Sequence, residues 1–135
     1  MSIGVKEIAY SVYAVSDFDR SLKFYQETLG LKLDFAMPEC DGPCWAEFDV
    51  GGSALAIGKN ADWKPSTAGC TVALEVEDFE TAIAKLREAD VKFIMEPMDT
   101  GVCQMACIAD PDDNPLLIHK RKPQPANARL VPRNA

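Results

Sequence analysis

The chain has 135 residues, 47% of them hydrophobic and 26% charged, a composition typical of one globular domain with its own core. Its 21 acidic residues outnumber the 14 basic ones, and the net charge of −7 excludes the basic surface that nucleic-acid binding requires. No apolar run approaches the roughly 18 residues of a membrane-spanning helix, and no signal sequence follows Met1, so we expect a cytoplasmic protein without membrane contacts.

The first predicted element is a strand at residues 8–15, where β-branched and aromatic residues dominate. Ser16 or Asp17 then offers an N-cap to a helix whose apolar residues recur at helical spacing from Phe18 to Leu29. Gly30 follows as a stop signal. Three short strands are expected next, near residues 31–36, 45–50 and 53–58.

After a linker at residues 60–68, the same order of elements is predicted again. A strand covers residues 71–76, and a helix with an apolar face of Phe79, Ile83 and Leu86 extends to about residue 89. Three further strands are expected, near residues 92–95, 103–109 and 115–120. Tight turns at Gly51-Gly52 and Asp112-Asp113 would join the last two strands of each set, because glycine and aspartate tolerate positive φ.

An internal repeat underlies this symmetry. An offset of 61 relates Val15-Ser16-Asp17-Phe18 to Val76-Glu77-Asp78-Phe79, Leu55 and Ile57 to Leu116 and Ile118, and residues 49–53 to residues 110–114. The sequence therefore predicts an α+β fold of two tandem β-α-β-β-β units. Unit one covers about residues 5–60 and unit two about residues 69–122. Together they form a single domain at residues 1–122, and the proline-containing residues 123–135 form a C-terminal tail.

Histidine and cysteine usage limits the metal chemistry. His119 is the only histidine, which excludes a two-histidine iron site and histidine-rich zinc sites. Five cysteines without a secretory signal favour reduced thiols. Two cysteine pairs share an x3 spacing that suits zinc poorly, so buried structural thiols are favoured over a metal site. These pairs are Cys40 with Cys44 and Cys103 with Cys107.

Several short motifs, in order along residues 5–121, carry a resemblance to a known family. They are Val15-Ser16-Asp17, Ser21-Leu22-Lys23-Phe24-Tyr25, Leu29-Gly30-Leu31 and Asp110-Pro111-Asp112-Asp113-Asn114. With the repeat, they make the chain resemble the vicinal oxygen chelate superfamily, the group of glyoxalases, bleomycin resistance proteins and extradiol dioxygenases. The resemblance implies that the paired units form a curved mixed sheet around a cavity, often across a homodimer.

The resemblance also equates four positions of this chain with the family's metal ligands. They are Tyr10 and Thr71 on the first strands and Ala56 and Leu117 on the last strands. Metal-using members carry His, Gln or Glu there, whereas this chain offers only the marginal tyrosine. We therefore expect no metal site and no cofactor, which disfavours the metal-dependent glyoxalase, fosfomycin transferase and dioxygenase activities.

Strand alternation gives a map of the expected cavity. Residues 72, 74, 76, 116 and 118 are uniformly apolar and should pack on the helices, so the mixed faces should line the cavity. The candidate ligand-binding residues are Tyr10, Val12, Trp45, Ala56, Thr71, Ala73, Glu75, Met105, Leu117 and His119. Alternative interpretations stay open, since Tyr10, Trp45 and Met105 also suit a core, and Glu75 and His119 also suit solvent-exposed strand ends.

Three functions fit this map. The first is a metal-independent protein that binds a small hydrophobic or aromatic ligand, with a homodimer closing the cavity. The alternative is a glyoxalase-like lyase or isomerase, or a dioxygenase-related enzyme, acting on a small metabolite with His119, Glu75 and Tyr10 as catalytic candidates. The third is a regulatory module whose pocket senses a metabolite. The composition argues against nucleic acids and membranes as partners.

Overall fold

The computed structural model describes residue 4 and residues 8–37 and 44–123. The first half consists of β1 (Ser11–Ala14), α1 (Phe18–Lys23), the π-helical turn η1 (Phe24–Thr28), β2 (Lys32–Met37), β3 (Cys44–Val50) and β4 (Ser53–Lys59). The second half consists of β5 (Val72–Glu75), α2 (Phe79–Glu88), β6 (Phe93–Asp99), β7 (Cys103–Ala109) and β8 (Pro115–Arg121). The prediction of two β-α-β-β-β units is confirmed.

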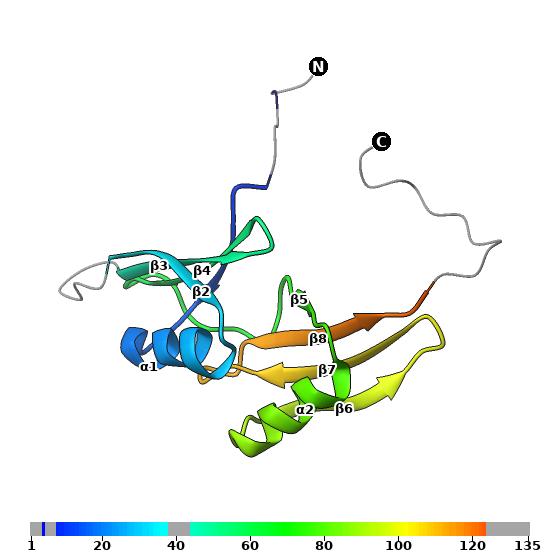
Figure 1. Cartoon of the computed structure of the whole chain (residues 1–135). Coiled ribbons are helices and arrows are strands. Elements are labelled where there is room, and N and C mark those ends of the chain that lie inside the picture. Colours follow the sequence, from blue (N-terminus) through cyan, green and yellow to red (C-terminus); the bar gives the residue numbers. More distant parts are fainter. Residues whose placement is uncertain (1–3, 5–7, 38–43, 124–135) are drawn as a thin grey trace.

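Each half forms its own four-stranded mixed sheet, and Figure 1 shows the two sheets as separate layers. The strand orders are β1-β4-β3-β2 and β5-β8-β7-β6. In each sheet the first strand pairs parallel with the last strand of its half, and the remaining pairs are antiparallel. The first strand of each half therefore lies at the edge of its sheet, beside the last strand.

The 61-residue offset holds in the register of the parallel pairs. Ser11 lies opposite Leu55 in the first sheet, and Val72 lies opposite Leu116 in the second. The helix starts repeat as well, because the side chain of Asp17 caps α1 and that of Asp78 caps α2. In each case the carboxylate accepts the N–H of the residue three positions on, a group that the helix itself leaves unpaired.

The offset does not hold for the hairpins, where the prediction is wrong. Asp49 pairs with Ala54 in the first sheet, whereas Ala109 pairs with Pro115 in the second, so β7 is offset from β3 by 60. Gly51-Gly52 is a two-residue turn with φ of 59° and 88°, but the second hairpin has a longer loop at residues 110–114. One inserted residue there restores the 61 offset from β8 onward.

Two further predicted elements differ from the structure. The strand expected at residues 8–15 is shorter in the structure, where β1 covers Ser11–Ala14 in register with β4 and the N–H of Val15 donates to the carbonyl of Gly58. The single helix expected up to Leu29 changes into the π-helical turn η1 after Lys23, and the N–H of Leu29 donates to the carbonyl of Phe24, five residues back. The tail expected at residues 123–135 lies almost entirely outside the described residues.

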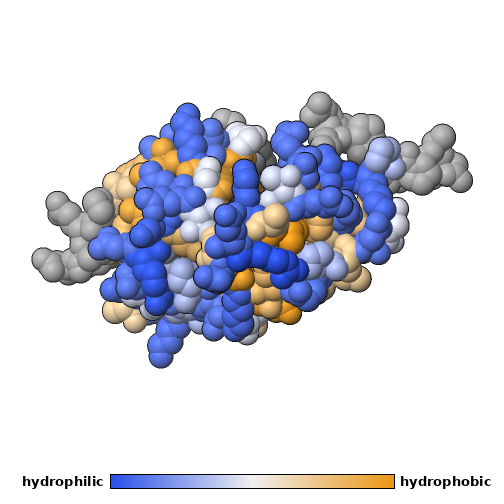
Figure 2. Space-filling view, turned by 60° about the horizontal axis from the view of Figure 1, so that its bottom comes forward, coloured by the Kyte–Doolittle hydropathy of each residue, from blue (hydrophilic) through white to orange (hydrophobic). Residues whose placement is uncertain are grey.

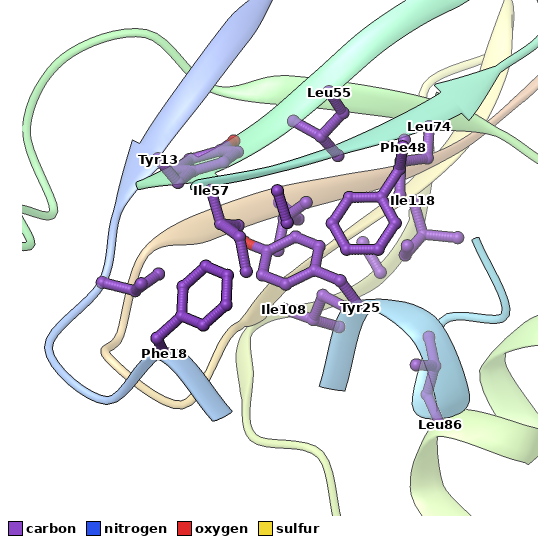
Figure 3. Close-up of a cluster of buried hydrophobic side chains, with 14 of the residues drawn as sticks. Tyr13, Phe18, Tyr25, Phe48, Leu55, Ile57, Leu74, Leu86, Ile108 and Ile118 are labelled. Carbon is purple, nitrogen blue, oxygen red and sulfur yellow. The ribbon is translucent and has the colours of Figure 1, made fainter. Parts of the chain in front are cut away.

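One hydrophobic core spans both halves, as Figure 3 shows. Tyr25 is fully buried at its centre and stacks on Phe48 with ring centroids 5.8 Å apart. Ile108 and Ile118 from the second sheet and Leu86 from α2 belong to the same cluster. Burial of each large side chain stabilises the fold by about 1.5–3 kcal/mol, so the shared core holds the two sheets in one relative position.

The helices present polar residues on the side opposite the core. In α2 the buried residues are Phe79, Ile83 and Leu86, at helical spacing, and the remaining positions carry mostly charged or small residues. Figure 2, which turns the bottom of Figure 1 toward the viewer, shows a largely hydrophilic surface interrupted by apolar patches. In the described part of the chain, no helix is long and apolar enough to cross a membrane.

A buried polar junction connects the loop between β7 and β8 to the first half. The Asp110 carboxylate is 4% exposed, and its Oδ1 accepts the backbone N–H groups of Asp112 and Asn114 at 2.8 Å. Its Oδ2 accepts the Tyr25 hydroxyl at 3.0 Å and Asn114 Nδ2 at 2.8 Å. Asn114 Nδ2 also donates to the carbonyl of Ala14 at 2.8 Å. These buried groups satisfy one another, which makes the junction a specific link between the halves.

Tyr13 forms a second link between the halves. Its hydroxyl donates to the carbonyl of Pro115 and accepts the N–H of Val72, each at 2.7 Å, so it connects β1 to the starts of β8 and β5. Burial raises the pKa of this phenol above its ordinary value, while the bond from the Val72 N–H lowers it in part. The hydroxyl therefore stays protonated and keeps both hydrogen bonds over the physiological pH range.

Candidate functional site

Each sheet has one side packed in the core and one side that we call its open face. On β1, Tyr13 is buried and Val12 is exposed, and on β5, Leu74 is buried whereas Ala73 and Glu75 are exposed. The predicted helix-facing residues at 72, 74, 76, 116 and 118 all pack in or against the core, which confirms the assignment of faces.

The predicted ligand-binding residues divide between the two open faces. Tyr10, Val12, Trp45 and Ala56 belong to the first sheet, and Thr71, Ala73, Glu75, Met105, Leu117 and His119 belong to the second. Within each sheet, register partners come together, with Val12 opposite Ala56 and Ala73 opposite Leu117. The two groups lie on separate sheets, so the cavity that the map assumed is not formed by one sheet alone.

Three aromatic residues meet on the open face of the first sheet, and we call Tyr10, Trp45 and Trp63 the aromatic cluster. The rings of Tyr10 and Trp45 lie edge to face with centroids 5.0 Å apart, and those of Trp45 and Trp63 are 6.2 Å apart. Tyr10 and Trp63 are 44% and 41% exposed. The alternative that Tyr10 and Trp45 are core residues is therefore not favoured, since these rings reach the surface.

Two neighbours complete the surroundings of the cluster. Trp45 Nε1 donates to Glu47 Oε2 at 2.7 Å, which fixes the indole next to a carboxylate. Gly58 lies beneath the indoles, and a Cβ atom there would be 2.8 Å from Trp63 and 3.0 Å from Trp45. The strand register explains the positions of Gly58 and Glu47. Gly58 lies opposite Trp45, and Glu47 lies opposite Ala56. The absence of a side chain at position 58 is what lets the two rings approach the sheet.

The open face of the second sheet carries a hydrogen-bonding contact that joins two catalytic candidates. His119 Nδ1 lies 2.5 Å from Glu75 Oε1, and the other carboxylate oxygen accepts the backbone N–H of Arg121 at 2.7 Å. The two residues are register partners on β5 and β8, which explains their contact. The His119 side chain is 21% exposed and therefore partly shielded, whereas that of Glu75, the last residue of β5, is 51% exposed.

The Glu75 carboxylate is stabilised in its charged form. The bond from the Arg121 N–H, followed by the contact with His119, lowers the pKa of Glu75 below its ordinary value. Because this pKa is lower in the folded than in the unfolded chain, the contacts stabilise the fold above the ordinary glutamate pKa. That stabilisation is lost as the pH falls through the lowered value. Since Glu75 is half exposed, the effect on stability is small, about 1 kcal/mol or less.

The four positions that the resemblance equates with metal ligands have been placed by the structure on the two open faces. Tyr10 and Thr71 each precede the first strand of their half by one residue, and Ala56 and Leu117 are equivalent in β4 and β8. Ala56 and Leu117 have no donor atom, and Ala56 is completely buried. Among the described residues, no three His, Cys, Asp or Glu side chains form a group that could hold a metal ion.

The cysteines differ from the expectation of reduced thiols in one case. Cys44 is buried and disulfide-bonded, whereas Cys70, Cys103 and Cys107 are free. Cys103 and Cys107 lie on β7 and are buried, as expected for structural thiols, and burial raises the pKa of Cys107. Cys40, which the sequence analysis grouped with Cys44, lies outside the described residues.

A cavity of about 410 Å³ is lined by residues of both halves, and Glu75 is one of them. It lies at the end of η1, the end of β3 and the start of α2, and its lining also includes Leu29, Val50, Leu74 and Thr81. By the internal repeat, this place corresponds to the polar junction at residues 110–114. The two-residue turn at Gly51-Gly52 is too short to fill it as the longer loop fills its counterpart. We therefore interpret the cavity as a consequence of unequal hairpins.

Sequence reasoning missed Glu47, Gly58 and Trp63. The spacing of two between Trp45 and Glu47 within a strand could have placed the carboxylate on the same face. Gly58 had no distinguishing signal, because a glycine at a strand end suits many roles. Trp63 lies in the predicted linker, where periodicity carries no information. The side chain of Asn60 accepts the N–H groups of Asp62 and Trp63, and this turn carries the indole back over the sheet.

Comparison with known proteins agrees with this geometry. Residues 7–118 match the family described as the Glyoxalase/Bleomycin resistance protein/Dioxygenase superfamily. A lactoylglutathione lyase from Haemophilus influenzae is 27% identical to this chain, over 78% of this chain and 86% of that protein. The trypanothione-dependent glyoxalase I of Leishmania major has a TM-score of 0.70 at 25% identity, over 86% of this chain and 87% of that one.

A protein described as binding an antibiotic has the same fold. TnmS3 from Streptomyces sp. CB03234 has a TM-score of 0.71 at 23% identity, over 90% of this chain and all of that one. Relatives described as enzymes and a relative described as a binding protein therefore share this architecture. The fold alone does not separate the two functions, and the side chains of the open faces must do so.

Proposed function

Because the chain belongs to the Glyoxalase/Bleomycin resistance protein/Dioxygenase superfamily, we propose that it binds a small hydrophobic or aromatic molecule without the help of a metal ion. The observation that carries the proposal is the chemistry of the four ligand-equivalent positions, Tyr10, Ala56, Thr71 and Leu117. Two of them have no donor atom, so the chelation of a divalent ion by four side chains is lost. The aromatic cluster supplies the apolar contact surface in its place.

We further propose that the protein acts in the cytoplasm as a homodimer in which a second copy covers the open faces. Large apolar side chains on these faces support this, since Val12, Phe35, Met37 and Met98 are each between 38% and 50% exposed. Surfaces of this kind are usually covered in solution. Sedimentation at micromolar concentration should give the mass of two chains, and a monomer would count against this part of the proposal.

Removal of metal ions should leave ligand binding unchanged. We expect the purified protein to contain far less than one equivalent of zinc, nickel, manganese or iron, because the open faces offer no matching donor set. A library of aromatic compounds should yield ligands whose affinity, measured by calorimetry, does not change after treatment with a chelator. A stoichiometric metal ion whose removal abolishes binding would contradict the proposal.

A second candidate function is a metal-independent lyase or isomerase, and the contact between Glu75 and His119 favours it. The Glu75 carboxylate would hold Nδ1–H of His119, which leaves Nε2 free to take a proton from a bound molecule. Glu75 would act as a positioning residue, since it orients the ring. The similarity to a lactoylglutathione lyase gives a first compound to assay.

The variant His119→Gln separates the two candidates. If the protein is an enzyme, turnover of lactoylglutathione or a related thioester should resist a chelator and fall about 100-fold in the variant. Glu75→Gln should then move the pH profile of the reaction. If the protein only binds its ligand, no turnover occurs, and His119→Gln lowers affinity about tenfold.

A further inference from the structure

We propose that the aromatic cluster and Glu47 together form a subsite for an organic cation, such as a substituted ammonium group carried by an apolar ligand. This inference rests on the proposed function and names the chemical class of ligand that the first open face selects. It adds Glu47, Gly58 and Trp63 to the residues that determine binding.

The cluster presents aromatic faces in different directions. The planes of Tyr10 and Trp45 differ by 83°, and those of Trp45 and Trp63 differ by 59°. Since Tyr10 and Trp63 are each more than two-fifths exposed, a ligand can reach ring faces that are not parallel. The face of an aromatic ring carries a partial negative charge, and several such faces around one point attract a cation.

The position of Trp63 depends on two local features. The Asn60 side chain accepts the N–H groups of Asp62 and Trp63 at 2.9 and 3.0 Å, which turns the chain immediately after β4. Gly58, two residues before Asn60, leaves the space that the two indoles occupy. Trp63 is therefore held against the sheet by defined contacts, although it belongs to a loop.

The charge next to the cluster has no counterion within the described residues. Glu47 accepts a hydrogen bond from Trp45 Nε1, but no lysine, arginine or histidine in the described part of the chain forms an ion pair with it. Its side chain is only partly exposed. A partly buried carboxylate without a counterion beside aromatic rings favours a positively charged ligand and disfavours a negative one.

The rest of this open face is consistent with a cation. Register places Lys32 opposite Asp49, two residues along β3 from Glu47, or about 7 Å away at the rise of a strand. Among the described residues, Lys32 forms no ion pair with Glu47. On the second sheet, by contrast, Glu75 is already paired with His119. Glu47 thus places a carboxylate without an ion pair among the described residues directly beside the aromatic cluster.

Three probes that share a naphthalene ring test the inference. They are (naphthalen-1-ylmethyl)trimethylammonium, neutral 1-naphthalenemethanol and anionic 1-naphthaleneacetate. We expect the cation to bind at least about tenfold more tightly than the neutral probe and the anion to bind most weakly, as measured by calorimetry at low salt. Gly58→Ala and Trp63→Leu should each weaken binding of all three, and Trp63→Leu alters an exposed side chain that the core does not need.

Glu47→Gln isolates the charge, because the amide oxygen can still accept the hydrogen bond from Trp45. The variant should remove most of the cation's advantage and leave the neutral probe unaffected. Asp49→Asn is the matched control, since it removes the same charge from the same strand and should leave the advantage intact. Equal binding of cation and neutral probe, or equal effects of the two variants, would overturn the cation subsite while ligand binding stands. Failure of all three probes to bind would contradict the proposed function as well.

Discussion

Replacing Asp110 by alanine is expected to destabilise the protein by about 3–5 kcal/mol, the largest effect of any single polar substitution considered for this chain. The carboxylate accepts four hydrogen bonds, and its removal would leave the donors of Tyr25, Asp112 and Asn114 buried without their partner. Burial raises the pKa of Asp110 above its ordinary value, and the bonds from Asn114 and Asp112 counteract this. Urea unfolding at neutral pH measures the loss.

Two comparisons make the Asp110 result specific. Asp34→Ala, which removes a carboxylate from an exposed strand position, should change the free energy of unfolding by less than about 0.5 kcal/mol. Tyr25→Phe removes only one of the four donors and should cost about 1–3 kcal/mol, so it gives a measurable value if Asp110→Ala does not fold. An Asp110 variant as stable as the Asp34 variant would show that the junction does not hold the halves together.

Replacing Tyr13 by phenylalanine is expected to cost about 2–4 kcal/mol, the second largest effect. The phenol oxygen is the partner of both the Val72 N–H and the Pro115 carbonyl, so its loss leaves two partly buried backbone groups unsatisfied where the halves meet. The phenylalanine ring keeps the packing in the core, which isolates the hydroxyl as the cause. The free energy of unfolding is again the quantity to measure.

Tyr10→Phe is the matched control for Tyr13→Phe. Tyr10 precedes the same strand, is 44% exposed, and its hydroxyl has no hydrogen-bond partner among the described residues. The free energy of unfolding of the Tyr10→Phe variant should therefore stay within about 0.5 kcal/mol of that of the unsubstituted protein. If both substitutions cost the same, the hydroxyl bridge of Tyr13 would carry no special share of the stability.

The local features of this fold were accessible from the sequence. The repeat, the capping role of Asp17 and the alternation along β1 and β5 each depend on residues within a few positions of one another. Capping and period-two burial follow directly from such spacing. For the same reason the offset of 61 predicted equivalent register in the two parallel pairs, and the structure has it.

The features that were not accessible depend on contacts between distant segments. The inserted residue between β7 and β8 shows only in strand register, because the aspartates of residues 110–114 resemble residues 49–53 at the wrong offset. The role of Asp110 depends on Tyr25, which is 85 residues away. The change to a π-helical turn after Lys23 likewise comes with Tyr25 at the centre of the core, and helical spacing alone did not reveal it.

The same distinction between local features and contacts of distant segments applies to the candidate site. Composition determined that His119 is the only histidine, the family resemblance supplied the four candidate ligand positions, and strand alternation grouped Glu75 with His119. Only the tertiary structure brought Trp63 from a loop onto the sheet, beside Trp45 and over Gly58. Spacing along one strand fixes which face a side chain occupies, but which segment covers that face is decided by packing across the whole chain.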